Sequence, residues 1–360
     1  MHISKRKIDI FSPYVLIIVM IIFLIMGYIG SFNYRFKDPL NTQTILTVIY
    51  SCIIFLMGIL CVRGNFTVKK IDYRIISGRF LLFMSLFALI LQSLNMILLG
   101  GIPLFNSVLK SNATTNLWRI AYPLFLISVN VLIAKYYDKK YLLLVLLGAL
   151  IFGLNGYRTS VLGILVSAFI NLYYQRKISK KMSVIFILVI IAGLLLTGYV
   201  ASQSIVNQKW TLNPVELIFH RAAFTLEVLE KIIPLSATTH GHILGMIFSS
   251  GSPRTFIGNY VLHYDVCLTS TILGPVLLDF GYVGLTIQMF LMGIFLSVLH
   301  KLKDGVGIGL YSVILTHTLI WIETGPTDIM VWFLYLLGLI YIILCVKSSP
   351  ENLKLFFKKH

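Results

Sequence analysis

Two arginines, each within a short segment of small polar residues, have the chemistry to bind an anion. Arg158 lies in the segment 156–160 (GYRTS), and Arg254 lies in the segment 252–255 (SPRT). The planar guanidinium fork matches the oxygens of a phosphate or diphosphate, and at Arg254 also those of a sugar. Each arginine also has an ordinary interpretation, as a side chain snorkelling at a span end or as a solvated loop residue. The sequence marks both as candidates.

A third arginine, Arg221, lies on the apolar side of a predicted helix. Asn213, Pro214 and Glu216 form the pattern of an N-cap, a first helical position and a capping box. At about 100° per residue, the polar side chains share one stripe: Glu216, His220, Glu227, Glu230 and Lys231. Arg221 points about 100° away from that stripe. A cation on an apolar face costs free energy unless it is paired or bound to something.

Two pairs of polar residues, His240 with His242 and His263 with Asp265, could bind a sugar or accept a proton. A metal site needs three or four converging ligands, and two i,i+2 pairs without a helical framework do not supply them. We therefore expect no metal and no cofactor. Simple loop polarity stays open as the alternative for both pairs.

Carboxylates also lie at the edges of apolar segments. Asp279 precedes a long apolar run, where a carboxylate is favourable against the helix dipole. Glu323 and Asp328 bracket a short turn, as a loop acid and an N-cap.

The elements that must position these residues are membrane helices. Hydrophobic residues make up 58% of the 360-residue chain and charged residues 12%, against about 25% charged in soluble domains. Apolar runs of this length predict membrane spans. We predict an all-α polytopic membrane protein with about ten transmembrane helices. The spans are placed at 11–31, 44–62, 80–99, 119–136, 141–156, 159–174, 182–201, 281–299, 305–322 and 328–346.

The positive charge sets the orientation. The net charge of +17 does not form one patch, because the lysines and arginines flank the apolar runs, and this excludes nucleic acid as a partner. The connections between successive spans fall alternately on the two sides of the membrane, and most of the lysines and arginines lie in the connections of one side. The positive-inside rule places that side in the cytoplasm. Both termini then lie inside. We predict one integral membrane domain, 1–360, with a large extracytoplasmic loop, 202–280, that contains an amphipathic or re-entrant helix.

One pair of spans requires a choice. Residues 141–174 could form one long helix, which would place the basic residues after 174 outside the membrane. A hairpin with its tip at 156–160 keeps them inside, so we predict two helices here.

Several absences narrow the function. The chain has no GxxxxGK[ST], HExxH or GxSxG motif, and its four cysteines form no CxxC pair. No Asp, Glu, Lys or Arg lies in the middle of a predicted span, whereas ion-coupled transporters usually carry such residues.

Three features together resemble the oligosaccharide repeat unit polymerases, the Wzy-type O-antigen polymerases, especially their archaeal and exopolysaccharide relatives. They are the GYRTS segment, the segment from Arg221 to Gly245, and the stretch 269–284 with the following span. The resemblance covers about residues 140–300.

The resemblance implies a glycosyltransferase of surface polysaccharide biosynthesis. Such polymerases transfer a growing glycan from its polyprenyl diphosphate carrier to the non-reducing end of a new lipid-linked unit, on the outer face of the cytoplasmic membrane. It implies that the diphosphate and sugars are bound by Arg158, Arg221, Arg254 and His240. The candidates for a base or a sugar contact are His242, Asp279 and Asp265.

Other functions remain open. An O-antigen-type ligase or another lipid-linked-sugar glycosyltransferase would share the substrate. A polysaccharide flippase is the alternative from another class, although flippases usually have more spans and no large outer loop, and a structural membrane subunit is a third. The expected partners are the lipid-linked oligosaccharide and the bilayer, with a chain-length regulator or a flippase as candidate proteins.

Overall fold

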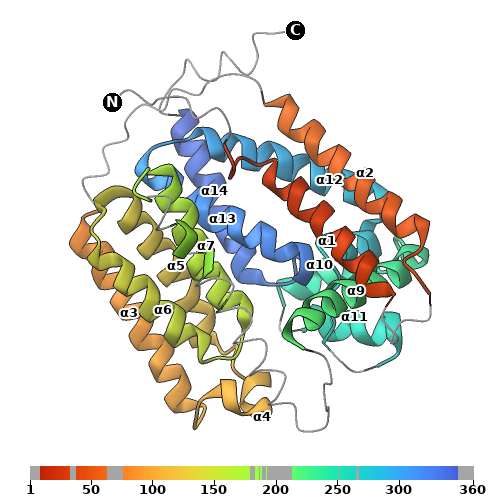
Figure 1. Ribbon diagram of the computed structural model, residues 1–360, viewed down its shortest axis with the longest axis horizontal. Helices are drawn as coiled ribbons and strands as arrows, with labels where there is room; N and C mark the ends of the chain where they lie inside the picture. The colour runs from red at the N-terminus through yellow and green to blue at the C-terminus, as the bar shows by residue number, and fades with distance from the viewer. Residues whose placement is uncertain are drawn as a thin grey trace. The chain divides into compact units, whose positions relative to one another are not determined.

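The computed structural model describes most of the chain, and every regular element in the described part is a helix (Figure 1). The described residues are 9–32, 38–62, 76–178, 183–185, 187–188, 192, 213–249, 251–264 and 267–347. Most of the predicted span 182–201 lies outside them, as do residues 202–212 at the start of the predicted outer loop. The all-helical class is confirmed for the part of the chain that the structure describes.

The chain divides into two compact units, which are described separately. Unit 1 comprises Met1–Asn65, His220–Lys301 and Trp321–Thr327, and unit 2 comprises Phe66–Phe219, Leu302–Ile320 and Asp328–His360. Each unit is therefore assembled from segments far apart in the sequence. The description of the chain as one membrane domain stays a prediction.

Unit 1 contains two helices that are long and apolar enough to cross a membrane, one shorter apolar helix and several further helices. Its elements are α1 (Val15–Ser31), α2 (Thr42–Cys61), most of α9 (Pro214–Ile232), the 3-10 turn η2 (Ile233–Leu235), α10 (His242–Ile247), α11 (Pro253–Leu262) and α12 (Gly274–Lys301).

Helices α2 and α12 pack closely because two glycines face each other. A Cβ added to Gly58 would clash with the backbone carbonyl of Phe290, and one added to Gly293 would clash with that of Phe55. Small residues allow helix backbones to approach closely in membranes, where packing rather than the hydrophobic effect drives association. The hydroxyls of Thr47 and Tyr282, 2.9 Å apart, add a hydrogen bond across the same pair of helices.

Helix α12 starts earlier than the predicted span 281–299. It runs from Gly274 to Lys301, with a break at Gly281, whose φ of 63° and ψ of −158° are not helical. A residue with a side chain is disfavoured there, because positive φ values favour glycine. The sequence pattern located the glycine but gave no sign that helix continues on both sides of it.

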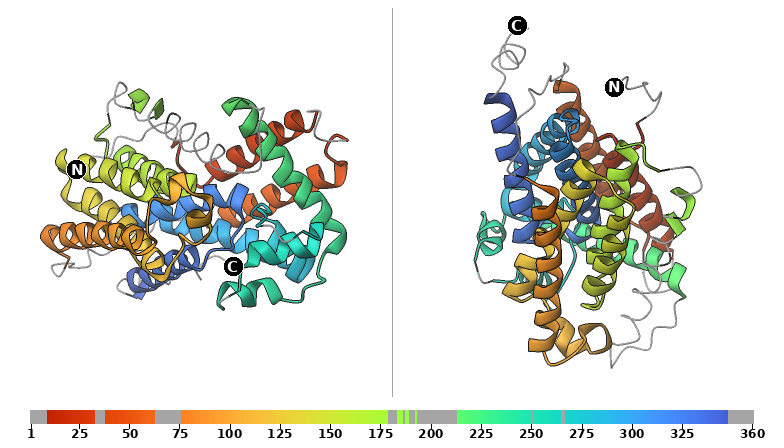
Figure 2. Two further views of the ribbon diagram at one scale, coloured as in Figure 1. Left: turned by 90° about the horizontal axis from the view of Figure 1, so that it is seen from below. Right: turned by 90° about the vertical axis from the view of Figure 1, so that its left-hand side faces the viewer.

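Unit 2 is a bundle of apolar helices (Figure 2). Its elements are α3 (Gly78–Leu98), η1 (Pro103–Phe105), α4 (Ser107–Ser111), α5 (Asn116–Tyr136), α6 (Lys140–Gly153), α7 (Arg158–Tyr174), α13 (Gly305–Thr324) up to Ile320, and α14 (Ile329–Lys347).

Polar side chains inside unit 2 pair across its helices. Ser85 of α3 donates to Ser128 of α5 at 2.8 Å, and Asn130 of α5 donates to Ser167 of α7 at 2.9 Å. All four residues are buried. Such pairs satisfy polar groups that would otherwise be costly in hydrocarbon, and they fix which helix faces meet.

The hairpin predicted within 141–174 is confirmed as two helices, α6 and α7. Gly156 adopts a φ of 75° at the turn, a value that favours glycine. The backbone N–H of Leu104 donates to the carbonyl of Leu154 at 2.8 Å, and the hydroxyl of Tyr157 donates to that of Lys110 at 2.7 Å. The segment around η1 and α4 therefore holds the hairpin tip in place.

The lengths of the helices fit a multi-pass membrane protein. Five helices of the described residues are long and apolar enough to cross a membrane, namely α2, α3, α5, α12 and α13. Three shorter apolar helices lie at 15–31, 140–153 and 329–345. The count of about ten spans and the inward position of both termini stay predictions.

The contact between Gly58 and Gly293 gives the first testable prediction. We expect Gly293→Ala to lower the thermal unfolding temperature of the purified protein in detergent, because the added methyl group meets backbone atoms that cannot rotate away. Overpacking of this kind costs about 1–3 kcal/mol. Gly245→Ala is the matched control, since an added Cβ there meets nothing within 4 Å. Equal unfolding temperatures for both variants would contradict the proposed packing.

Candidate functional site

Helix α9, which carries Arg221, begins as the sequence predicts. The side chain of Asn213 accepts a hydrogen bond from the backbone N–H of Glu216 at 2.8 Å, and Glu216 accepts one from that of Asn213 at 3.0 Å. This reciprocal pair confirms the predicted capping box and fixes the start of the helix. One residue of the polar stripe contacts another helix, because Glu230 accepts a hydrogen bond from the backbone N–H of Asn41 at the start of α2.

Arg221 is paired, as a cation on an apolar helix face must be. Its Nε donates to Oε1 of Glu323 at 2.8 Å, and its Nη2 donates to Oγ1 of Thr269 at 3.2 Å. The charged side chains are 38% and 36% exposed, so water partly screens the ion pair. A polar or charged ligand could therefore reach the guanidinium from solvent.

Thr269 belongs to a buried connecting segment, residues 269–273, that precedes α12. Its hydroxyl lies 3.3 Å from that of Thr225 on α9. Thr271 has a φ of 60°, which is a true outlier for a β-branched residue and costs about 1–3 kcal/mol. Its own Oγ1 accepts a hydrogen bond from the N–H of Leu273 at 3.2 Å. Backbone strain of this kind clusters at functional sites, which favours this segment as part of one.

The turn after α13 lies against the same segment. A Cβ on Gly325, whose φ is 76°, would lie 2.8 Å from the carbonyl oxygen of Thr271. Ser270 is buried, and its Oγ has no hydrogen-bond partner among the described residues. A buried hydroxyl without a partner is uncommon in native structures and can mark a ligand or water position.

Arg254, on helix α11, contacts the same turn. Ser252 is the N-cap of α11 and Pro253 is its first residue, which places Arg254 in the first turn. The Nε of Arg254 donates to Oγ1 of Thr327 at 2.9 Å. The carbonyl of Arg254 accepts a hydrogen bond from the N–H of Leu268 at 3.1 Å, which ties α11 to the start of the connecting segment.

Arg221 and Arg254 therefore meet at one structural element, the turn 323–327, although 33 residues separate them in the sequence. We call these two arginines, Glu323, Thr269 and Thr327 the arginine cluster. Its named members are two guanidinium groups, two hydroxyls and the carboxylate of Glu323. The chemistry that this arrangement supports is the binding of an anion.

Asp279 has a different environment. It is buried, and its carboxylate accepts hydrogen bonds from Oγ1 of Thr239 and from the backbone N–H groups of Ile243 at 3.0 Å and Leu244 at 2.8 Å. It therefore holds the N-terminal turn of α10 against α12. Its sequence interpretation as a carboxylate at the N-terminus of the long apolar helix missed this second helix.

Two of the predicted site histidines lie beside this contact in the sequence. His240 and His242 are exposed, and the ring of His242 lies 4.9 Å from that of Phe256 on α11. His240 and Gly241 have positive φ values of 48° and 86°, which form the turn into α10. Asp265 lies outside the described residues.

Arg158 belongs to unit 2, where it is the first residue of α7. Its N-cap residue is Tyr157, whose side chain forms no capping hydrogen bond. The structure thus brings together two of the three predicted arginines, and it describes Arg158 within the other unit.

Sequence reasoning missed two features. The local sequence of Glu323 indicates only a loop acid and gives no sign of Arg221 as its partner. His317 is the other, because a histidine within an apolar helix is uncommon, and that is the signal that the sequence offers for it. No group of three or more His, Cys, Asp or Glu side chains that could hold a metal occurs in the part of the chain that the structure describes.

Comparison with known proteins identifies the family. Residues 9–335 match the family model described as "Putative O-antigen polymerase", and the chain belongs to this family. The match spans both units and includes every residue of the arginine cluster. It confirms the family resemblance found in the sequence.

Two proteins of Methanocaldococcus jannaschii, both described as uncharacterized, are similar along most of the chain. MJ0419 is 29% identical over 325 residues, covering 83% of this chain and 88% of the relative. MJ0420 is 30% identical over 337 residues, covering 94% of this chain and 77% of the relative. No solved structure matches.

The Asp279 contact gives a second prediction. We expect Asp279→Ala to accelerate amide hydrogen exchange at Ile243 and Leu244, because both N–H groups lose their acceptor. A buried donor left without a partner costs about 1–3 kcal/mol. Exchange is followed by mass spectrometry on peptides covering 239–248, with peptides of α3 as the internal control. Unchanged protection in both regions would contradict the assigned contact.

Proposed function

We propose that this protein polymerises lipid-linked oligosaccharide repeat units for a surface polysaccharide. The observation that carries the proposal is the convergence of Arg221 and Arg254 on the turn 323–327, within a chain of the O-antigen polymerase family. The substrate in this proposal is a glycan on a polyprenyl diphosphate carrier. Its reaction takes place at the extracytoplasmic face of the cytoplasmic membrane.

The reaction needs positive charge at one place. A hydroxyl oxygen of the new unit attacks the anomeric carbon of the growing glycan, the bond from that carbon to the diphosphate breaks, and the proton of the hydroxyl passes to a base. The lipid diphosphate leaves with the electron pair and gains negative charge. Donors already aimed at that charge lower the barrier, which is the task we assign to the arginine cluster.

Glu323 fits this task as a carboxylate that holds Arg221 in place before the diphosphate binds. Its Oε1 accepts the hydrogen bond from Nε of the guanidinium, which an oxygen of a diphosphate could accept in its place. The incoming diphosphate competes with a single carboxylate for a partly exposed guanidinium. Pairing with Glu323 keeps the cation positioned in an otherwise apolar environment.

The other predicted site residues have separate roles in this proposal. Arg158 is a further anion ligand, and His240 is a sugar contact. Asp279 is a positioning residue, because its carboxylate already accepts three hydrogen bonds that hold α10. His242 and Asp265 stay candidates for the base or for sugar contacts. A chain-length regulator or a flippase is a candidate partner.

The cluster gives a third prediction. We expect Arg221→Ala and Arg254→Ala each to reduce polymerisation by about 100-fold, the size of effect seen when one stabilising donor is removed from a transition state. The measurement is the length distribution of surface polysaccharide in cells that express each variant, with membrane insertion verified. Lys231→Ala is the control, because Lys231 is an exposed cation on the same helix paired with Glu227. Its polymer should have normal length.

Two results would overturn the assignment of the arginines. One is normal polymer from folded, inserted Arg221→Ala and Arg254→Ala variants. The other is an equal loss of polymer in the Lys231→Ala control, which would trace the effect to helix α9 and not to the cluster.

A fourth prediction separates the candidate functions. We expect a strain that lacks the gene to accumulate single repeat units on lipid at the outer face, because the step after export is blocked. Long chains left on the carrier would instead indicate a ligase, and units trapped inside would indicate a flippase. The readout is the size and membrane sidedness of the lipid-linked glycans.

A further inference from the structure

Three aromatic rings contact one another in a row in unit 1, and the proposed function leaves two of them unused. Phe256 and Tyr260 lie on α11, with ring centroids 5.5 Å apart and planes inclined by 16°. The imidazole of His242, the first residue of α10, lies 4.9 Å from the ring of Phe256. We call His242, Phe256 and Tyr260 the aromatic platform. All three belong to the same unit as the arginine cluster.

The sequence of α11 accounts for the pair of stacked rings. Residues four positions apart are neighbours on a helix surface, so Phe256 and Tyr260 lie one above the other. The buried face of the helix is formed by other residues, namely Pro253, Ile257, Gly258 and Val261. At about 100° per residue, the two aromatic positions lie at one edge of this face. The helix is therefore anchored by its buried face, and the rings stay half-buried beside it.

The position of His242 depends on the contact at Asp279. The backbone N–H groups of the next two residues, Ile243 and Leu244, donate to that carboxylate and fix the start of α10 against α12. Because His242 is the first residue of α10, the same contact sets the place of its imidazole beside Phe256. The platform is thus built from two helices that the fold holds together.

A ligand can reach the platform from solvent. His242 is exposed, and Phe256 and Tyr260 are half-buried. Within the described part of the chain, neither the imidazole of His242 nor the hydroxyl of Tyr260 takes part in a hydrogen bond. Binding sites for small ligands typically combine aromatic surface, which supplies contact area, with a few polar groups that fix orientation. The platform has both components.

A pyranose ring matches this chemistry. The face of an aromatic ring carries negative potential, and the C–H groups on one face of a sugar ring are apolar and slightly positive. The hydroxyls at the edge of the sugar are hydrogen-bond partners for an imidazole and a phenol. An acyl chain would cover the rings but offers nothing to the two polar groups, whose desolvation would then be uncompensated. The platform therefore fits a sugar better than a hydrocarbon.

Helix α11 connects the platform to the arginine cluster. Arg254 and Phe256 are two positions apart, so they point about 160° away from each other around the helix axis. The guanidinium and the rings therefore lie on different sides of one helix. If the diphosphate binds at the arginine cluster, a sugar on the platform is remote from the anomeric carbon whose bond to the diphosphate breaks. Such a sugar belongs to the part of the glycan beyond the reacting residue.

We propose that the aromatic platform is a sugar-binding subsite, which stacks a pyranose of the lipid-linked oligosaccharide at a distance from its diphosphate. This inference rests on the proposed polymerase function for the identity of its ligand. His242 is then a sugar contact and not the base. The subsite binds the substrate and the transition state equally, because the sugar that it holds does not take part in the reaction.

The test measures binding separately from polymerisation. The probe is an oligosaccharide released by partial acid hydrolysis from the surface polysaccharide of the strain that produces the protein. It is titrated into the full-length protein in lipid nanodiscs. Tyr260→Leu removes the outer ring of the platform, Phe256→Leu removes the middle ring, and Tyr260→Phe keeps the ring but removes its hydroxyl. The unfolding temperature of each variant verifies that it is folded.

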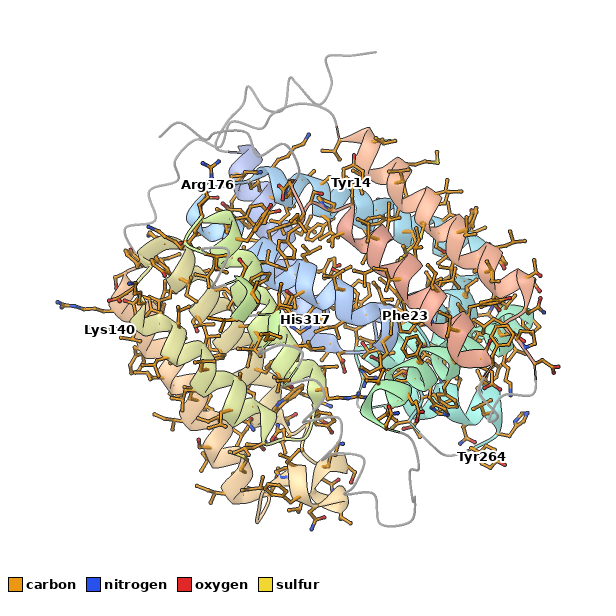
Figure 3. The ribbon with its side chains drawn as sticks, viewed as in Figure 1. Tyr14, Phe23, Lys140, Arg176, Tyr264 and His317 are labelled. Atoms are coloured by element: carbon orange, nitrogen blue, oxygen red, sulfur yellow. The ribbon has the colours of Figure 1, made fainter. Side chains whose placement is uncertain are left out.

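Tyr264→Leu is the matched control. Tyr264 lies just beyond the end of α11 and is labelled in Figure 3. It is 69% exposed and has no ring partner among the described residues. The control therefore removes an aromatic side chain from the same segment without changing the platform.

We expect Tyr260→Leu and Phe256→Leu each to raise the Kd of the oligosaccharide by about tenfold, because a stacked ring and its contact area are lost. Tyr260→Phe should raise it by no more than about threefold, since an exposed hydrogen bond contributes little. Tyr264→Leu should leave the Kd unchanged. With lipid-linked units as substrate, the Tyr260→Leu and Phe256→Leu variants should raise KM by about tenfold at unchanged kcat, which is the pattern of a contact made equally in ground and transition states.

A second measurement needs no substitution. In the wild-type protein, saturation-transfer NMR with irradiation of the aromatic protons should give signal on the ring C–H protons of the oligosaccharide, because stacking brings the two sets of protons together. The amount of transfer reports the contact directly and does not depend on the stability of any variant.

Three results would overturn the inference. The first is an unchanged Kd in folded Tyr260→Leu and Phe256→Leu. The second is an equal loss of binding in Tyr264→Leu, which would assign the effect to contact of exposed aromatic side chains with the lipid surface. The third is the absence of saturation transfer in the wild-type protein. If the wild-type protein binds the oligosaccharide through Tyr260 but does not lengthen lipid-linked units, the polymerase function fails and the sugar subsite stands.

Discussion

A membrane interior offers no water to polar groups, and this constraint governs the structure of the protein. Every backbone N–H and C=O within the hydrocarbon must find a partner in its own segment, so the long apolar runs form helices. The few polar side chains between them pair across helices, as Ser85 does with Ser128. Charged side chains are therefore concentrated at helix ends and in loops, where the candidate chemistry is found.

The same constraint explains the arginine cluster. Arg221 lies on the apolar side of α9, so its charge needs a partner that the helix itself does not supply. Glu323 and Thr269 provide it from two other parts of the chain. These partners lie next to the turn at Gly325 and the strained segment around Thr271, so one ion pair links α9 to two other segments of unit 1. An anionic ligand would bind a guanidinium group that Glu323 and Thr269 already hold in position.

Much of the local structure could be predicted from residue types alone. The capping box at Asn213 and the hairpin around Gly156 depend on residues close in sequence, and both were predicted correctly. The partner of Arg221 and the role of Asp279 were not predicted. Glu323 is 102 residues from Arg221, and Asp279 holds backbone N–H groups that any residue type can supply. A contact of this kind leaves no pattern in a single sequence.

By itself, then, the sequence determined the all-α membrane class, the family and the three arginines as candidates for anion binding. Hydropathy and charge are sums over neighbouring residues, which is why they can be read along a chain. Only the tertiary structure decided that Arg221 and Arg254 share one turn, that the carboxylate of Asp279 is occupied, and that His317 meets Tyr122. These contacts depend on helix packing, and packing is a property of the folded chain.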